Sequence, residues 1–201
     1  MRAVLWCNGD VPEPSLVKIL QENATLFGVD GGARKAEDAG FDVTEVLGDL
    51  DSVKPDNWKG RSTLLSDESS SDLAKSICHL NAQGYNEIDV VGIDGGCPDH
   101  ILGIWAVLTE VPDNMVIRMH HTQGMTIRFH PIEKELQIII PEGTEFSVFA
   151  LEKCNSVTIQ GSKWELDEEP LSFSTRGLHN QSLGELIRIS ADGILAIILH
   201  G

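Results

Sequence analysis

The chain has 201 residues, of which 31 are acidic and 15 basic, and its formal net charge is −16. This length predicts one large domain or two small ones, and the composition is that of a folded protein. The negative charge argues against nucleic acid or an anionic membrane as the main partner, because both would be repelled at long range. A phosphate ligand would therefore need local help from metal ions or backbone amides.

The cysteines and the apolar runs indicate the compartment. The four cysteines form no C-x-x-C pair, which fits neither a zinc ribbon nor a dense disulfide framework, and we interpret them as reduced thiols. The first ten residues carry too short an apolar run for a signal peptide, and the later run GILAIILHG is too short to cross a bilayer. The sequence thus predicts a soluble cytoplasmic protein.

Short apolar segments alternate with helix-length segments from residue 1 to about 118. Strands are expected at 3–7, 25–30, 45–49 and 87–93, and helices at 14–23, 32–40, 71–84 and 99–111. In the helix at 71–84, Leu73, Ile77 and Leu80 form one stripe, with Ser71 or Asp72 as the N-cap. This alternation predicts an α/β domain over residues 1–118, with an open parallel sheet and helices on both faces.

The pattern changes from residue 119 onward. Six strand-like runs, beginning with TIRFHPI and ending with ILAIILH, are separated by glycine, proline, asparagine or acidic turns. Short strands at this spacing are typical of an antiparallel sandwich or barrel. We therefore expect an all-β domain over residues 119–201, with the boundary inside the segment 111–124.

An asparagine, several aspartates and several glycines follow the expected strands, where a parallel sheet would bring them to one edge. They are Asn8, Asp10, Asp30, Gly31, Gly32, Asp49, Asp51, Asp94, Gly95, Gly96 and Asp99. In an extended segment the side chains of residues i and i+2 point the same way, so Asp49 and Asp51 should face one volume. Ionised carboxylates share a site only around a cation, and Mg²⁺ prefers oxygen ligands and phosphates. The set predicts metal-assisted phosphoryl chemistry, although aspartate and glycine also form turns.

Six motifs occur in a characteristic order. They are DGGA (30–33), GDLDS (48–52), SDLAK (71–75), GGCPDH (95–100), VTIQGSKWEL (157–166) and FSTRGLHN (173–180). In this order and spacing they resemble the thiamine pyrophosphokinase family over nearly the whole chain. The resemblance implies transfer of diphosphate from ATP to the hydroxyl of thiamine, which gives thiamine diphosphate and AMP. It also implies a nucleotide-binding α/β domain, a thiamine-binding β-sandwich and a homodimer with sites between subunits.

The resemblance assigns roles to individual residues. The residues expected around Mg²⁺ and the phosphates are Asp49, Asp51, Asp72 and Asp99, with Lys75 close by. The residues expected to bind the nucleotide are Asp30, Gly31, Gly32, Ser52, Gly95, Gly96 and His100. The residues expected at the thiamine end are Trp164, His179 and Asn180. Asp99 or Asp72 would accept or orient the proton of the thiamine hydroxyl.

The chain departs from the family pattern at four positions. It has Leu50 for phenylalanine, Cys97 for arginine, Ile104 for asparagine and His179 for serine. The cation lost at residue 97 could be supplied by Arg34, Lys35 or Arg176. Two alternatives therefore stay open: a diphosphokinase for another hydroxymethyl acceptor, such as a pterin or pyrimidine, and a non-catalytic protein that binds thiamine or nucleotide.

Several histidines and tryptophans are expected to lie outside the site. His120, His121 and His130 fall in the expected linker and the strand after it, without the spacing of a metal site, and we interpret them as surface residues. The three tryptophans expected to pack in the interior are Trp6, Trp58 and Trp105. Trp164 is assigned to a ligand through its motif alone.

Overall fold

The structure is a computed structural model that describes residues 1–52 and 55–201. The chain divides into two compact units, Met1–Thr122 and Gln123–Gly201. The predicted boundary between residues 118 and 119 falls within a strand, β6 (Val116–His121). Because β6 pairs in parallel with the strand before it in the chain, its residues belong to the first unit. Arg118, His120 and His121 interrupt the apolar pattern of β6, which is why the segment resembled a linker.

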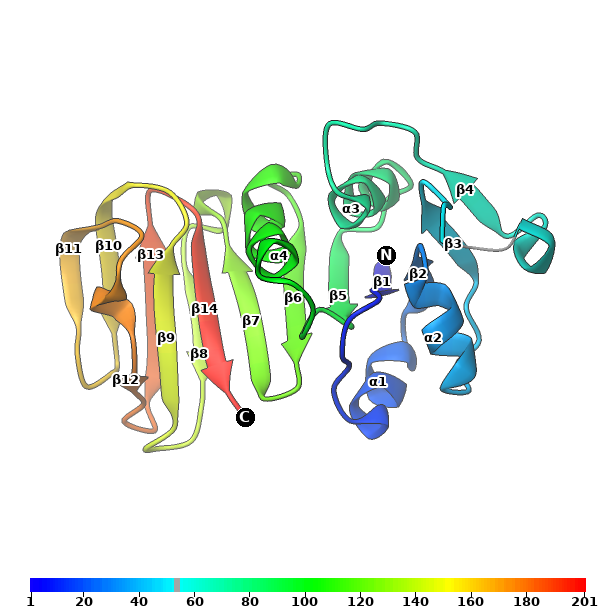
Figure 1. Cartoon of the computed structure of the whole chain (residues 1–201). Coiled ribbons are helices and arrows are strands. Elements are labelled where there is room, and N and C mark those ends of the chain that lie inside the picture. The colour runs from blue at the N-terminus through cyan, green and yellow to red at the C-terminus, as the bar shows by residue number, and fades with distance from the viewer. Residues whose placement is uncertain (53–54) are drawn as a thin grey trace. The chain divides into compact units, whose positions relative to one another are not determined.

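Within the described residues, the first unit has six parallel strands in the spatial order β6–β5–β1–β2–β3–β4 (Figure 1). The other strands are β1 (Arg2–Trp6), β2 (Thr25–Val29), β3 (Glu45–Gly48), β4 (Ser62–Leu64) and β5 (Glu87–Val91). The helices are α1 (Pro14–Gln21), α2 (Gly32–Asp38), α3 (Asp72–Ala82) and α4 (Pro98–Glu110), with a 3-10 turn at Pro55–Trp58. The strands and helices predicted for this half are present, and β4 and β6 are additional.

Both faces of the central strand β1 are covered, because its consecutive residues from Ala3 to Trp6 are all buried. On one face, Val4 and Trp6 share a core cluster with Val17 of α1 and Ala36 of α2. Helix α3 contacts β2 and β3 and buries the predicted stripe of Leu73, Ile77 and Leu80. No helix in the described residues is long and apolar enough to span a bilayer.

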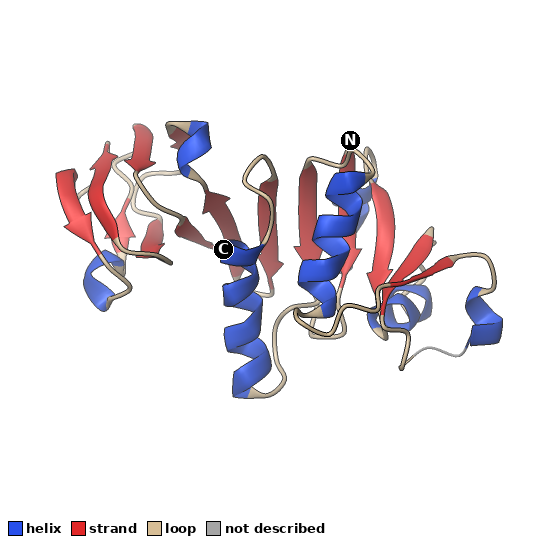
Figure 2. Cartoon of the chain, turned by 90° about the horizontal axis from the view of Figure 1, so that it is seen from above, coloured by secondary structure: helices blue, strands red, loops and turns tan. Residues whose placement is uncertain are grey.

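The second unit consists of strands and loops apart from two short 3-10 turns, η2 (Pro131–Glu133) and η3 (Thr175–Gly177) (Figure 2). One antiparallel sheet has the order β12–β9–β14–β7 and contains Asn180–Gln181, Glu145–Ala150, Leu195–His200 and Gly124–Phe129. The other has the order β11–β10–β13–β8 and contains Leu166–Leu171, Cys154–Gln160, Leu186–Ala191 and Leu136–Ile139. Residues of both sheets share one apolar core, so the sheets pack face to face.

His120 corrects the expectation that the three histidines are surface residues. It is buried on β6, and its Nε2 lies 2.7 Å from Oδ1 of Asp89, which is itself fully buried. The Nε of Arg2 lies 2.7 Å from the other oxygen of Asp89. Burial by itself would raise the pKa of Asp89, but hydrogen bonds from His120 and Arg2 outweigh it, and the pKa lies below its ordinary value.

Candidate functional site

Three of the predicted aspartates lie together at the carboxyl ends of β2 and β3. Oxygen atoms of Asp30, Asp49 and Asp51 all lie within 4.8 Å of one another. The N–H of Ser52 donates to Oδ1 of Asp30 at 3.3 Å, and the N–H of Asp51 donates to Oδ1 of Asp49 at 3.1 Å. These bonds orient the carboxylates from the backbone of the same loop. Hard oxygen atoms at this spacing fit Mg²⁺.

The backbone brings Asp49 and Asp51 together by a turn and not by an extended strand. Strand β3 ends at Gly48, and Leu50 has a φ of 64°, in the left-handed region. The expectation that both side chains meet was right, but the reason given for it was wrong. Leu50 and Asp30, whose φ is 46°, hold conformations that cost free energy in L-residues, and such strain is common at functional sites.

Asp72 joins this group from the start of α3. Its Oδ1 accepts a hydrogen bond from the N–H of Asp49 at 3.1 Å and lies 2.8 Å from Nζ of Lys75. The same Nζ donates to the carbonyl oxygen of Leu65 at 3.1 Å. Ser71 is the N-cap of α3, so Asp72 lies in the first helical turn, where the helix dipole favours a negative charge. Lys75 thus reaches the carboxylates from one turn further along the helix.

Two clefts of the first unit contain most of the residues predicted for its site. One has a volume of about 510 Å³, and the predicted residues that line it are Asp30, Asp72, Gly95, Gly96, Asp99 and His100. The other has a volume of about 440 Å³ and is lined by Asp49 and Lys75. Ser71 and Asp72 line both clefts, so the two adjoin at the start of α3. The first unit therefore gathers acidic side chains from four loops around connected hollows.

Gly31 and Gly32 differ in what a side chain at each position would contact. A Cβ on Gly31 would lie 3.3 Å from Nδ2 of Asn8 and 3.6 Å from Cβ of Ser52, at the surface of the site. A Cβ on Gly32 would lie 2.2 Å from the carbonyl oxygen of Trp6. Gly32 is therefore required for the close packing of α2 against β1, whether or not it contacts a nucleotide.

Three cations were candidates to replace the arginine absent at residue 97. Lys35 is the one of the three that lines the larger cleft. Its Nζ lies 2.5 Å from the carbonyl oxygen of Asn8 and 3.4 Å from that of Gly9. Arg34 is mostly exposed and lies 3.9 Å from Asp38. Arg176 pairs with Glu169 in the second unit. The sequence had left the three equivalent, and the structure distinguishes them.

Asp94 has a structural role. Its carboxylate accepts hydrogen bonds from the N–H and Oγ1 of Thr122 and lies 2.8 Å from Nδ1 of His121. Burial by itself would raise the pKa of Asp94, but the hydrogen bonds from Thr122 and His121 lower it below its ordinary value. Asp94 was expected with the acids at the strand ends, and it lines the larger cleft, but its oxygens anchor the end of β6.

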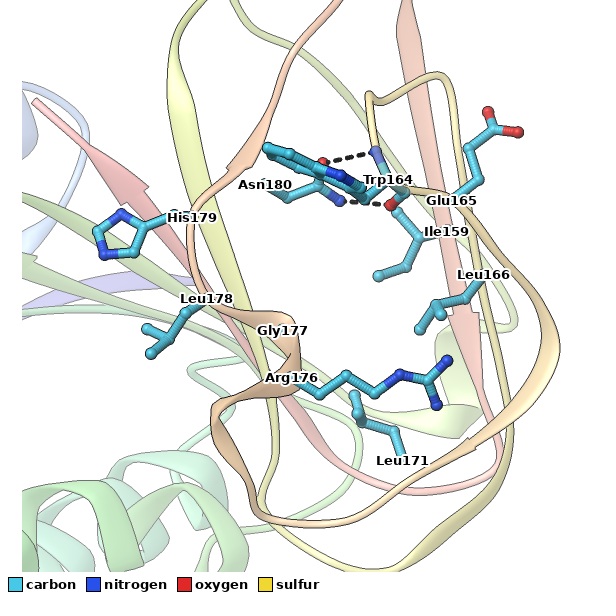
Figure 3. Close-up of a pocket in the computed structure, with 10 residues that line it drawn as sticks. All are labelled: Ile159, Trp164, Glu165, Leu166, Leu171, Arg176, Gly177, Leu178, His179 and Asn180. Carbon is cyan, nitrogen blue, oxygen red and sulfur yellow. Dashed lines mark hydrogen bonds between the residues drawn. The ribbon is translucent and has the colours of Figure 1, made fainter.

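The predicted thiamine-end residues lie in the second unit, around a pocket of about 440 Å³ (Figure 3). Ile159, Leu166 and Leu171 give it an apolar wall, and Trp164 is 55% exposed at the pocket. Asn180 is buried, and two hydrogen bonds join its amide to the main chain of Trp164. The pocket can therefore hold a flat, largely apolar ring system against an indole.

The ring of His179 points away from the other side chains of this pocket (Figure 3). Its Nδ1 lies 3.0 Å from Oε2 of Glu145, and the ring stacks on His200 with centroids 6.0 Å apart. The backbone of His179 has a φ of 55°, and its N–H donates to Oγ of Ser147. We therefore expect the main chain of His179, and not its ring, to face a ligand.

Sequence reasoning missed Lys163, which precedes Trp164 in the motif. Its ammonium lies 4.5 Å from the centroid of the Trp164 ring, over one face of the indole. Adjacent residues of a strand point to opposite sides, so this contact was not expected from the motif. The turn between β10 and β11 makes it possible, and one face of the indole is thereby engaged.

Two family models match this chain. The model described as "Thiamin pyrophosphokinase, catalytic domain" matches residues 16–119, and "Thiamin pyrophosphokinase, vitamin B1 binding domain" matches residues 126–193. The chain belongs to the thiamin pyrophosphokinase family. The identification from the sequence motifs is confirmed, and the enzyme class is that of the family. The catalytic-domain match contains the gathered aspartates of the first unit, and the vitamin B1 binding match contains Trp164 and Asn180.

Solved thiamin pyrophosphokinases have the same fold. The enzyme from Bacillus subtilis is 24% identical, with a TM-score of 0.83 over 100% of this chain and 99% of that one. The one from Geobacillus thermodenitrificans is 20% identical, with a TM-score of 0.81 over 100% and 98%. That from Candida albicans is 12% identical, with a TM-score of 0.77 over 99% and 89%. No curated protein matches the chain.

Proposed function

We propose that this member of the thiamin pyrophosphokinase family transfers the terminal diphosphate of ATP to the hydroxyl of thiamine, giving thiamine diphosphate and AMP. The observation that carries the proposal is that family models for catalysis and for vitamin B1 binding together cover residues 16–119 and 126–193. The cluster of Asp30, Asp49 and Asp51 supports it independently, because diphosphoryl transfer depends mostly on positioning and charge neutralisation.

The carboxylates of the first unit would hold the metal. Asp49 and Asp51, with Asp72 and Asp99 nearby in the clefts, offer the oxygen ligands that Mg²⁺ prefers. When bound, Mg²⁺ would neutralise charge on the phosphates and orient them for in-line attack. Asp30 belongs to the same cluster, so we add it to the candidate ligands and keep its role beside the nucleotide.

Asp99 is our choice for the general base. The sequence left Asp72 and Asp99 as alternatives. Oδ1 of Asp72 already accepts from the N–H of Asp49 and pairs with Lys75, so this oxygen is engaged by the fold. Among the described residues, no hydrogen-bond partner of the Asp99 carboxylate is found, and Asp99 lines the larger cleft. Asp99 could therefore accept or orient the proton of the attacking hydroxyl.

The nucleotide would lie in the larger cleft. Gly95 and Gly96 have φ values of 76° and 84°, and a Cβ on Gly96 would meet nothing within 4 Å, so a phosphate can approach the backbone. Lys35 would supply the positive charge that Cys97 does not. His100 and Ser52 complete the proposed nucleotide contacts, and Lys75 lies beside the phosphates with Asp72.

Thiamine would bind at the pocket of the second unit, against Trp164. We also propose the homodimer with sites between subunits that the family resemblance implies. Light scattering tests the dimer: a mass near twice 22.0 kDa supports it, and a monomer at assay concentration removes it.

The deciding experiment is AMP formation from ATP and thiamine in the presence of Mg²⁺. We expect thiamine-dependent AMP that stops when the metal is chelated and returns with added Mg²⁺. A folded sample that neither binds thiamine nor forms AMP would remove the assignment. A panel that includes hydroxymethyl pterin and hydroxymethyl pyrimidine would reveal a different acceptor. If thiamine binds but AMP forms only after Cys97→Arg, the chain is a binding protein that has lost turnover.

A further inference from the structure

Asn180 holds the main chain of Trp164 at two points (Figure 3). Its Oδ1 accepts a hydrogen bond from the N–H of Trp164 at 3.1 Å, and its Nδ2 donates to the carbonyl oxygen of Trp164 at 2.7 Å. The carboxamide thus pairs with one residue's backbone as a neighbouring strand would. Trp164 lies in the turn between β10 and β11, outside both strands, and this pairing restrains its main chain on both sides of the residue.

The other two hydrogen-bonding positions of the Asn180 amide are also filled. A carboxamide can accept two hydrogen bonds and donate two. Oδ1 also accepts from the N–H of Gln181 at 2.8 Å, and Nδ2 also donates to Oγ of Ser162 at 3.1 Å. Ser162 is buried and donates to the same Trp164 carbonyl at 3.3 Å. Within the described part of the chain, all four positions of the Asn180 amide have partners, and Asn180 is only 6% exposed.

The indole itself is engaged on one side. Nζ of Lys163 lies over the ring of Trp164 and 3.4 Å from Oε1 of Gln181. The N–H of Lys163 donates to the carbonyl oxygen of Gln181 at 2.9 Å. Trp164 is thus fixed at its main chain by Asn180 and contacted on one ring face by Lys163, while 55% of it stays exposed at the pocket.

We propose that Asn180 is a positioning residue: it fixes the main chain of Trp164, so that the indole is presented to thiamine in one orientation, and it makes no hydrogen bond to thiamine itself. A tryptophan held in place before binding loses less conformational freedom when the ligand arrives, which raises affinity without changing chemistry. The identity of the ligand rests on the proposed function, whereas the fixing of Trp164 by Asn180 does not.

The first test needs no ligand. The four tryptophans give four indole N–H signals in a spectrum of protein labelled with ¹⁵N-tryptophan, and Trp164→Phe identifies the signal of Trp164. In Asn180→Asp a carboxylate oxygen replaces the donor beside the Trp164 carbonyl, so the Trp164 signal should shift or broaden. The signals of the other three tryptophans should stay in place. An unchanged Trp164 signal in a folded Asn180→Asp variant would overturn the proposal.

The second test uses thiamine turnover. We expect Asn180→Asp to raise the KM for thiamine roughly tenfold, the size of effect that follows from losing hydrogen bonds in a buried pair, with kcat within about twofold. In a Trp164→Ala background the same change should raise KM no further, because Asn180 acts only through the tryptophan. A tenfold increase that persists without the indole would show direct contact with thiamine and overturn the proposal.

Ser162→Ala is the milder second variant, in case Asn180→Asp does not fold. It removes one partner of the Asn180 amide and should shift the Trp164 signal and raise the KM for thiamine about threefold; no change in either would count against the proposal. Asn23→Asp, at an exposed position of the first unit, controls for the added charge. If the Trp164 signal responds as expected but the wild-type chain does not bind thiamine, the positioning role stands and the proposed function falls.

Discussion

The N–H of Asp49 donates a hydrogen bond to Oδ1 of Asp72 across 23 residues of sequence. This contact ties the loop after β3 to the first turn of α3, and Lys75 lies 2.8 Å from the same oxygen. It therefore fixes the distance between two acidic loops that each contribute to the proposed metal site. Asp72 both orients its neighbours and adds charge, so its two roles can be separated by substitution.

Asp72→Asn keeps an oxygen for the Asp49 N–H but removes the negative charge. We expect kcat for AMP formation to fall about a hundredfold or more, because removing one preorganised electrostatic group from a transferring site has effects of this size. Steady-state kinetics at saturating ATP and Mg²⁺ measure it. Asp42→Asn, at an exposed aspartate on the loop before β3, is the control and should retain full activity. A rate within twofold of wild type for Asp72→Asn would place the metal site elsewhere.

Lys35→Met should weaken nucleotide binding and leave the fold intact. Lys35 is exposed, but its Nζ is held beside the carbonyls of Asn8 and Gly9 at the larger cleft. Losing one charge-assisted contact to a phosphate should raise the KM for ATP about tenfold. Arg34→Met is a matched control, because Arg34 is adjacent, is equally charged and lies near Asp38. Equal increases in the KM for ATP from the two substitutions would show that nucleotide binding depends on net charge and not on the position of Lys35.

Asp89 should make stability depend on pH in the acid range. Its pKa is lowered in the folded state despite burial, through hydrogen bonds from His120 and Arg2. A carboxylate with a lowered pKa stabilises the fold above the ordinary aspartate value of about 4, and this stabilisation is lost as pH falls through the folded pKa. Asp89→Asn should lower the free energy of unfolding by about 3 kcal/mol near neutral pH, since it removes the carboxylate that pairs with buried His120 and half-buried Arg2.

Denaturant unfolding of wild type and Asp89→Asn at a series of pH values measures this dependence. The difference in the free energy of unfolding should begin to shrink below about pH 4, where the unfolded carboxyl takes up a proton, and should disappear as pH falls through the lower pKa of the folded carboxyl. Asp42→Asn again serves as the control and should show no such trend. A difference that stays constant down to pH 2 would mean that the loss reflects packing at residue 89 and not its charge.

The alternation of apolar strands and helices was enough to predict the first unit, because each element carries its own local signal. Strand β4 has three residues, too few to show a period, and β6 carries half-buried Arg118 and buried His120, whose partners are distant in sequence. Both were missed for these reasons. Local pattern cannot reveal a charged side chain that is buried by pairing with another strand.

In the candidate site, too, some features could be predicted from the sequence and others could not. Motif order placed Asp30, Asp49, Asp51 and Asp72 correctly as neighbours, since strand ends converge in a parallel sheet. Which side chains remain available for a ligand could not be predicted. Asp94 lines the larger cleft of the first unit and Asn180 lines the pocket of the second unit, and yet the polar atoms of both are already used by the fold. Such use depends on contacts between loops, which spacing in the sequence does not encode.

We expect glycine at residue 48 to be required for the positions of the Asp30 and Asp72 carboxylates. Its φ is 142°, and a Cβ there would lie 3.4 Å from Cβ of Asp30 and from Cγ of Asp72. Gly48→Ala would therefore strain the backbone, and its methyl group would contact both aspartates, so any shift that relieves the strain would displace them. We expect a loss of about 1–3 kcal/mol in the free energy of unfolding and a fall in kcat of about tenfold or more.

Gly40→Ala separates the two effects, because Gly40 also has a positive φ, 84°, but a Cβ there would meet nothing within 4 Å. This control should lower the free energy of unfolding by about 1 kcal/mol and leave kcat unchanged, since its cost comes from backbone conformation alone. Measuring both quantities for both variants distinguishes strain from displacement of the carboxylates. If Gly48→Ala loses stability but retains full kcat, the positions of Asp30 and Asp72 are less critical to turnover than their shared contact with Gly48 indicates.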